Sequence, residues 1–289
     1  MTPIQAAGLG LVQGLTEFLP ISSTAHLVVV QNLFGLTEPP VSFDVIIHLA
    51  TALVTVIVLW SVIKALKFKQ LKLIILAMIP TGILGLFFNR WNELIFGSLI
   101  FTAVTLIING LILLLPKLIK FKDKPLNNQS AGLIGVAQGL AVLPGVSRSG
   151  STIVSGLLLG LKPEDAYNFS FLISLPAIAA AQLLQLKHLN LVEAEFVNFG
   201  LGFAAAFISG YFALLWLRRL VSRGRLTGFA VYCLILGGLL LFFLETHIEW
   251  VDFDREIGTN HFGAGDADCL AVFFSNGGQS YPLAGGGNI

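Results

Sequence analysis

Long apolar stretches alternate with short polar stretches along this chain. A helix that crosses a membrane needs about 20 consecutive apolar residues. Six segments come close to this length and predict membrane-spanning helices: 44–61, 72–88, 97–115, 167–186, 199–217 and 228–245. The pattern therefore predicts an all-α integral membrane protein.

Two further apolar regions, 5–34 and 130–161, are each interrupted near the middle by a polar run. The first run is PISSTAH, at 20–26, and the second is PGVSRSGST, at 144–152. The apolar pieces on either side have roughly 10–14 residues, which is too short to span a bilayer comfortably. Each region therefore predicts a re-entrant helix–loop–helix hairpin that enters the membrane and turns back.

Basic residues gather in three loops, and loops rich in Lys and Arg tend to face the cytoplasm. The loops contain Lys64, Lys67, Lys69 and Lys72; Lys117, Lys120, Lys122 and Lys124; and Arg218, Arg219, Arg223 and Arg225. With all three loops cytoplasmic, the six spans alternate consistently only if each hairpin enters and leaves on one side. The first hairpin then opens from outside, the second opens from the cytoplasm, and both chain ends lie outside.

The two broken regions also resemble each other in sequence. Gln-Gly-Leu at 13–15 recurs at 138–140, and Leu-Pro at 19–20 recurs at 143–144. Three spans follow each hairpin, and an odd number of crossings gives the two halves opposite orientations. We therefore predict an inverted repeat with halves 1–125 and 126–245, whose broken helices meet near the bilayer midplane. Residues 246–289 form an atypical polar, Gly-rich tail that we expect to be poorly ordered.

Composition supports a membrane protein and argues against several other classes. Of the 289 residues, 55% are hydrophobic and 11% are charged, with a mean hydropathy of +0.85. The 17 Lys and Arg nearly balance the 16 Asp and Glu, so no basic footprint for nucleic acid is present. Cys233 and Cys269 lie in unrelated contexts and suggest neither a disulfide framework nor a zinc site. The first basic residue is Lys64, so the N-terminal segment lacks the basic start of a signal peptide.

Polar side chains at membrane depth are costly and are therefore candidates for function. In the first broken region, Gln13 and Glu17 are four residues apart and share a helix face. Ser23 and His26 are three residues apart. A carboxylate, a serine and a histidine are the components of an activated nucleophile.

The second polar run supplies Arg148, whose guanidinium is suited to binding phosphate oxygens in pairs. Both runs follow a proline and open the returning helix of a hairpin, so each directs free backbone N–H groups at the turn. If the turns meet, they form an anion site that suits phosphate. The other hydroxyls of the two runs are candidate ligands for a diphosphate: Ser22, Thr24, Ser147, Ser149, Ser151 and Thr152.

Simpler interpretations exist for each residue taken alone. A serine or threonine in a membrane helix usually bonds to its own backbone, and Glu17 could line a water-filled path instead. His48 lies in the span that begins at 44, where a packing role is the simpler interpretation. We keep Gln13 and His48 as accessory candidates.

These two runs resemble the signatures of the undecaprenyl-diphosphate phosphatase family, which is also known for bacitracin resistance. The family's first signature is Glu or Gln, three residues, Glu, and then Pro, Ser-Ser-Thr and His; residues 13–26 read QGLTEFLPISSTAH. The second is Pro-Gly-x-Ser-Arg-Ser with a following Thr, and residues 144–152 read PGVSRSGST. The resemblance covers about residues 1–245.

The resemblance implies hydrolysis of a polyprenyl diphosphate lipid, undecaprenyl diphosphate, to the monophosphate, which recycles the lipid carrier for cell-wall polymers. It also implies a multi-pass protein of the bacterial plasma (inner) membrane, with a site open to the outer face, and a divalent cation, Mg²⁺ or Ca²⁺. Many members have Glu where this chain has Gln13, so Glu17 is the main acidic candidate for the metal. The resemblance leaves open whether the protein forms a homodimer.

Our mechanistic hypothesis has Ser23 attack the terminal phosphorus, while Glu17 or His26 removes its proton and Arg148 neutralises the developing charge. In a competing version the nucleophile is His26 or a metal-bound water. The main alternative function is a broken-helix transporter or flippase for a lipid phosphate or another anion. The acid phosphatase superfamily is a weaker rival, because no His follows Arg148 until His188.

Overall fold

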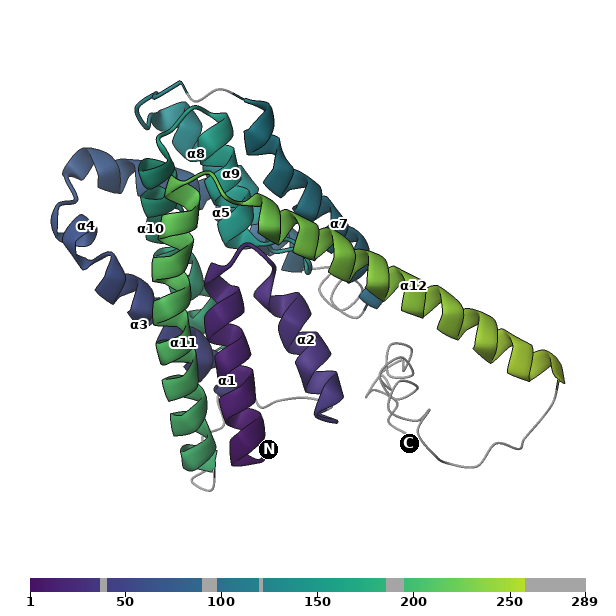
Figure 1. Cartoon of the computed structure of the whole chain (residues 1–289). Coiled ribbons are helices and arrows are strands. Elements are labelled where there is room, and N and C mark those ends of the chain that lie inside the picture. The colour runs from purple at the N-terminus through teal and green to yellow at the C-terminus, as the bar shows by residue number, and fades with distance from the viewer. Residues whose placement is uncertain (37–40, 90–97, 120–121, 186–194, 258–289) are drawn as a thin grey trace, which may run out of the picture.

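A computed structural model describes residues 1–36, 41–89, 98–119, 122–185 and 195–257, and the regular elements in these residues are all helices (Figure 1). The elements are α1 Pro3–Phe18, α2 Ser23–Leu33, α3 Val41–Val58, α4 Trp60–Lys64, α5 Phe68–Asn89, α7 Leu99–Leu114, η1 Leu115–Leu118, α8 Asn128–Leu140, α9 Arg148–Leu158, α10 Pro163–Gln185, α11 Phe196–Ser222 and α12 Thr227–Ile257.

Six helical segments in the described residues are long and apolar enough to cross a membrane, and they match the six predicted spans. They are Val41–Val58, Phe68–Phe88, Leu99–Leu118, Pro163–Gln185, Phe196–Ser222 and Thr227–Leu244. The all-α class and the six spans are therefore confirmed. The lipid-facing character is clearest in α5 and α12, where only 17% and 22% of the spanning window is buried.

Both broken regions form helix–turn–helix hairpins, as the polar runs predicted. Thr2 caps α1 through a reciprocal pair of bonds with Gln5, and α1 ends at Phe18, two residues before Pro20. Asn127 caps α8 in the same way, and the Ser147 hydroxyl accepts the Gly150 N–H at the start of α9. The α1–α2 and α8–α9 hairpins open toward opposite ends of the molecule (Figure 1), as an inverted repeat requires.

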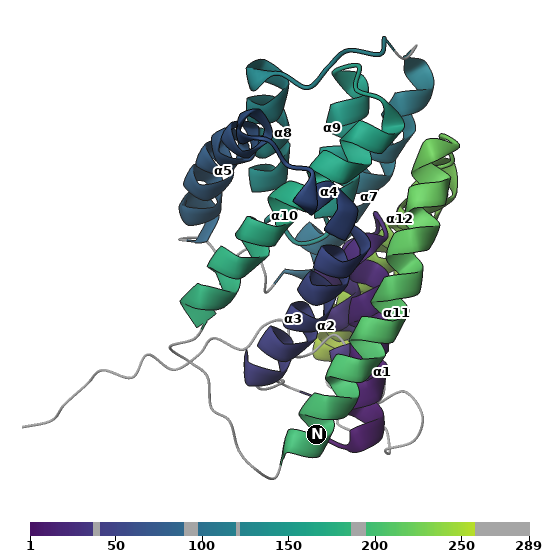
Figure 2. The same cartoon turned by 90° about the vertical axis from the view of Figure 1, so that its left-hand side faces the viewer.

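The helices of the two halves exchange partners. Helix α1 packs along α11, helix α8 packs along α5, and α7 packs along α12 (Figures 1 and 2). A Cβ added to Gly10 would lie 2.2 Å from the Gly202 carbonyl oxygen, and one added to Gly135 would lie 2.1 Å from the Ala77 carbonyl oxygen. Gly135 follows Gly10 by 125 positions, and Gly202 follows Ala77 by the same 125 positions. This equivalent pairing agrees with the repeat inferred from sequence.

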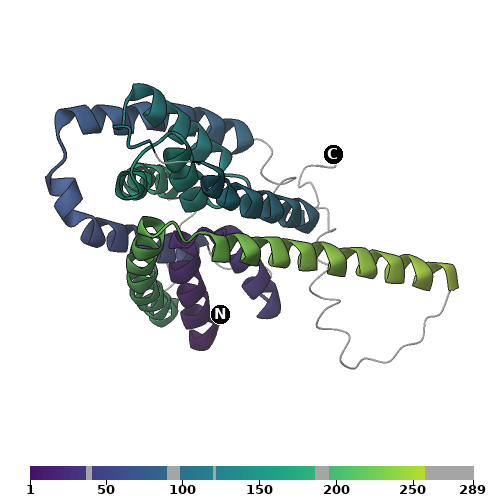
Figure 3. The same ribbon diagram turned by 45° about the horizontal axis from the view of Figure 1, so that its top comes forward.

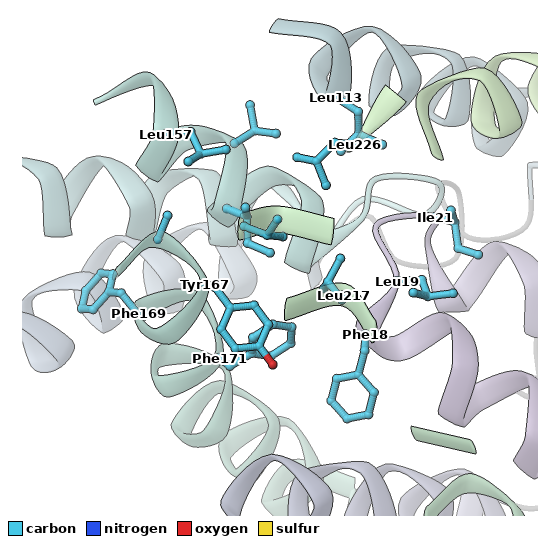
Figure 4. Packing of buried hydrophobic residues seen from close by; sticks show 14 of the residues in the cluster. Phe18, Leu19, Ile21, Leu113, Leu157, Tyr167, Phe169, Phe171, Leu217 and Leu226 are labelled. Atoms are coloured by element: carbon cyan, nitrogen blue, oxygen red, sulfur yellow. The ribbon is translucent and has the colours of Figure 1, made fainter. Parts of the chain in front are cut away.

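The larger apolar core packs against the turn between α1 and α2 (the first turn) and against the inner faces of α9, α10 and α11 (Figure 4). Phe18 meets Phe171 with ring centroids 5.8 Å apart, and Phe171 meets Tyr167 at 4.9 Å. The Tyr167 hydroxyl donates to the Leu214 carbonyl at 3.1 Å, which satisfies its polar group inside the core. This packing holds the end of α1 against the second half of the chain.

Helix α12 is longer than the span predicted for it. It continues to Ile257 and extends away from the other helices (Figure 3). The first part of the expected tail is therefore helical in its backbone, and residues 258–289 lie outside the described residues. The expectation that the tail is poorly ordered stays untested there.

Candidate active site

The two hairpin turns meet through an ion pair. Arg148, the first residue of α9, contacts a carboxylate oxygen of Glu17 in the last turn of α1 through Nη2 and Oε1. The Arg148 side chain is 17% exposed and the Glu17 side chain 8%. Because water screens such a pair poorly, removing either partner would leave a costly uncompensated charge.

The second oxygen of Glu17 is also engaged. The Ser23 hydroxyl donates to Glu17 Oε2 at 3.0 Å, and Gln13 Nε2 donates to the same atom at 3.1 Å. Helix spacing explains the second contact, because residues four apart lie on one face. The turn between α1 and α2 explains the first, because it brings the N-terminus of α2 back beside the end of α1.

Two buried polar atoms at this centre have no hydrogen-bond partner within the described part of the chain. They are Nη1 of Arg148 and Oε1 of Gln13. Buried polar groups in proteins are nearly always paired, so such atoms call for an explanation. A ligand that carries negative oxygens would satisfy the guanidinium nitrogen.

His26 is bonded at both ring nitrogens, and neither bond goes to Ser23 or Glu17. Nδ1 lies 2.7 Å from the Ser22 carbonyl oxygen, and Nε2 lies 2.6 Å from the hydroxyl of Tyr232 on α12. The two rings stack with centroids 5.6 Å apart and an interplanar angle of 15°. The structure therefore places His26 at the first turn, but with its ring directed at α12.

The hydroxyls at the turn between α8 and α9 (the second turn) differ in whether they already have a hydrogen-bond partner. Ser147 Oγ caps α9 and lies 3.2 Å from Ser149 Oγ. Thr152 Oγ1 lies 2.5 Å from Ser170 Oγ and donates to the Arg148 carbonyl at 2.8 Å. Ser151 Oγ is buried without a partner among the described residues. Ser151 Oγ can therefore accept a new hydrogen-bond partner without losing one, whereas Thr152 Oγ1 is already engaged.

Three other predicted residues occupy the edge of the centre. Ser22 is buried, with a φ of 67° that L-residues adopt at a cost. Thr24 is half-buried in the first turn of α2. His48 Nδ1 lies 2.7 Å from the Asp44 carbonyl oxygen on α3. Because a carbonyl only accepts, Nδ1 of His48 carries the proton.

The sequence reasoning missed the residue that joins the two turns. Asn109 on α7 is fully buried; its Nδ2 donates to the Pro20 carbonyl at 3.0 Å, and its Oδ1 accepts the Ser147 N–H at 3.0 Å. One helical turn earlier, the Thr105 hydroxyl donates to the Pro144 carbonyl. An asparagine inside an apolar span was itself a signal, because polar groups at membrane depth tend to be functional.

The centre offers few ligands for the expected divalent cation. Within the described residues, no three His, Cys, Asp or Glu side chains gather where they could jointly hold a metal ion. The available donors are the Glu17 carboxylate and the free amide oxygen of Gln13. Magnesium is commonly held by one or two carboxylates together with substrate phosphates. The residues fit a cation that arrives with, or is completed by, a diphosphate.

Fold and site together define a multi-pass α-helical membrane protein with a buried arginine–carboxylate centre between two broken hairpins. A family model described as bacitracin resistance protein BacA matches residues 6–239, and the chain belongs to this family. The matched region ends before the atypical tail begins.

Curated relatives resemble the chain over most of its length. A protein of Carboxydothermus hydrogenoformans named undecaprenyl-diphosphatase is 43% identical over 253 residues, which cover 83% of this chain and 97% of that protein. A protein of Desulfosudis oleivorans with the same name is 41% identical over 269 residues, covering 83% and 98%. In Halothermothrix orenii a third protein of this name is 38% identical over 245 residues, covering 81% and 95%.

Proposed function

We propose that this protein hydrolyses undecaprenyl diphosphate to undecaprenyl phosphate and phosphate, and so recycles the lipid carrier for cell-wall polymers and confers bacitracin resistance. The relatives' shared name supports the reaction. The observation that carries the proposal is one carboxylate, Glu17, which binds a serine hydroxyl through one oxygen and an arginine through the other. A nucleophile, a proton acceptor and a phosphate-binding cation thus share one centre.

Ser23 is the nucleophile in the mechanism that this geometry favours. Its hydroxyl already donates to Glu17, so the carboxylate can take the proton as the oxygen attacks the terminal phosphorus. The bond between that phosphorus and the bridging oxygen breaks, and undecaprenyl phosphate leaves. Water then hydrolyses the phosphoserine and releases phosphate. His26 is a weaker candidate, because both of its ring nitrogens are bonded elsewhere.

Arg148 links substrate binding to the activation of Glu17. Paired with arginine, the Glu17 carboxylate is a weak base. A diphosphate offers more negative oxygens than one carboxylate, and Nη1 of Arg148, which has no partner among the described residues, can donate to them. As the guanidinium turns toward the phosphate, Glu17 loses its counter-charge and becomes a better proton acceptor. In this proposal the rest of the phosphate site consists of hydroxyl side chains from the two turns: Ser22, Thr24, Ser147, Ser149, Ser151 and Thr152.

A divalent cation, Mg²⁺ or Ca²⁺, would be held by Glu17 and by the free amide oxygen of Gln13. When bound, it would supply positive charge to the phosphate oxygens. This oxygen is buried and has no partner among the described residues. His48 remains an accessory candidate, because the Asp44 carbonyl holds its Nδ1 and leaves Nε2 as the acceptor of the neutral ring.

The protein belongs to the bacterial plasma membrane in this proposal, with its site open to the outer face. The three basic loops support this orientation, because they place the opening of the α8–α9 hairpin on the cytoplasmic side and that of the α1–α2 hairpin outside. A homodimer is compatible with the exposed apolar faces of α5 and α12, which lipid would also cover.

Phosphate release from undecaprenyl or farnesyl diphosphate by detergent-purified protein tests the proposal. Ser23→Ala and Arg148→Ala should abolish release, whereas Ser222→Ala and Arg219→Ala, two exposed positions on α11, should leave it unchanged. Each assay is run with Mg²⁺, Ca²⁺ or a chelator. Folded wild-type protein that releases no phosphate under any condition would favour the transporter or flippase alternative. An active Ser23→Ala variant would refute the serine nucleophile alone.

A further inference from the structure

The contact between His26 and Tyr232 crosses from one half of the chain to the other. It combines a hydrogen bond of 2.6 Å with a stacked ring pair, so it fixes both the position and the plane of the imidazole. Its partner at Nδ1, the Ser22 carbonyl, belongs to the first turn. The ring is thus held between the turn that carries Ser23 and a helix of the opposite half.

The two partners determine where the proton on His26 lies. A carbonyl oxygen only accepts, so Nδ1 carries a hydrogen in every state of the ring. In the neutral imidazole, Nε2 is then the acceptor, and the Tyr232 hydroxyl must donate to it. In the charged imidazolium, Nε2 donates and the same hydroxyl accepts. A tyrosine hydroxyl can do both, so neither bond breaks when His26 gains or loses a proton.

The residue next to Tyr232 is fixed through Asn109, which also bonds to the first turn. This residue, Cys233, is fully buried, and the Cys233 sulfur lies 3.3 Å from Nδ2 of Asn109. The same asparagine nitrogen donates to the Pro20 carbonyl. The position of α12 against the first turn is therefore fixed one residue away from the tyrosine.

We propose that Tyr232 is a positioning residue for His26 and that its hydroxyl covers the lone pair of Nε2 while the Ser22 carbonyl keeps Nδ1 protonated. The inference rests on the proposed phosphatase function for its meaning in the reaction. Covering Nε2 prevents the imidazole from competing with Ser23 for the phosphoryl group. It also keeps the ring against the Ser22 carbonyl, so the first turn retains the shape that aims Ser23 at Glu17.

The test compares Tyr232→Phe with Tyr211→Phe, a matched control on α11 outside the centre. Phenylalanine keeps the stacked ring and removes the hydroxyl alone. Diethyl pyrocarbonate acylates a histidine nitrogen only when its lone pair is free, and peptide mass spectrometry can follow His26 and His48 separately. We expect His26 in Tyr232→Phe to react about tenfold faster than in wild type, the factor lost with one ordinary hydrogen bond. His48 should react equally in all three proteins.

Phosphate release gives the second readout. Tyr232→Phe should lower kcat about 3–30-fold, the effect of a small misplacement of reacting groups, with KM within about twofold of wild type. Equal acylation of His26 in wild type and Tyr232→Phe would overturn the covered lone pair. Faster acylation with an unchanged kcat would overturn the positioning role. A wild-type protein without phosphatase activity would refute the proposed function instead, while the acylation result would still test the contact.

Discussion

Replacing Asn109 with leucine should both destabilise the protein and slow the reaction. Leucine has nearly the same volume, so the change removes polar contacts without opening a large cavity. The Ser147 N–H would lose its Asn109 partner in a buried place, and the Pro20 carbonyl would keep only a weak contact from the Cys233 thiol at 3.8 Å. Each unsatisfied group costs about 1–3 kcal/mol, so the free energy of unfolding should fall by about 2–6 kcal/mol.

The effect on catalysis follows from where these two groups lie. Ser147 immediately precedes Arg148, and Pro20 lies three residues before Ser23, so a shift of either turn separates the groups that must act together. A displacement of about 1 Å can cost about 100-fold in rate, and we expect a fall of this order in kcat. The matched control is Ile108→Leu, at an exposed apolar position of the same helix.

The assays are thermal unfolding in detergent and phosphate release from undecaprenyl diphosphate. Asn109→Leu with a wild-type Tm and a kcat within about twofold would refute the idea that this side chain joins the turns. A lowered Tm with an unchanged kcat would separate the two effects, because it would assign Asn109 to stability alone.

Three further substitutions test other contacts. Arg148→Lys should lower kcat/KM about 100-fold or more, because an ammonium cannot bind Glu17 and phosphate in the paired geometry of a guanidinium; steady-state phosphate release measures it. Ser22→Gly should raise the unfolding free energy by about 1 kcal/mol, because glycine adopts the φ of 67° without strain, which thermal unfolding would detect. Gly10→Val should prevent folding, because its Cβ would lie 2.2 Å from the Gly202 carbonyl oxygen; size-exclusion chromatography in detergent reports the folded fraction.

Each of these has an outcome that contradicts it. A fully active Arg148→Lys variant would mean that charge alone suffices at this position. A Ser22→Gly variant no more stable than Ser22→Ala would mean that the backbone is not strained there. A well-folded Gly10→Val variant would mean that α1 and α11 can separate without loss.

The helices were predictable because their signal is local. An apolar run of sufficient length has few alternatives in a membrane, and a proline followed by serines and threonines ends one helix and begins another. The meeting of the two turns followed from the repeat, and the structure brings Glu17, Ser23 and Arg148 together. The full length of α12 could not be predicted from the sequence. Residues 246–257 contain charges, which argue against a membrane span but are compatible with a helix.

The partners of individual side chains could not be predicted in the same way. Gln13 and Glu17 meet within one helix, so their spacing was enough. His26 meets Tyr232 from 206 residues away, and no local pattern distinguishes that tyrosine from the other tyrosines of the chain. Asn109 carried a signal in its polarity, but its two partners depend on how α7 packs against both hairpins.

Because α1 packs against α11 and α8 packs against α5, each half of the chain depends on the other, and this has a consequence for biosynthesis. The ribosome synthesises α1 long before α11, so the face of α1 around Gly10 lacks its packing partner for most of translation. Glu17 lacks its partner as well, because Arg148 is synthesised 131 residues later. Such non-local contacts slow folding and expose unfinished surfaces. We therefore expect chains truncated before α11 to be recognised by membrane quality-control proteases, whereas chains that include it escape them.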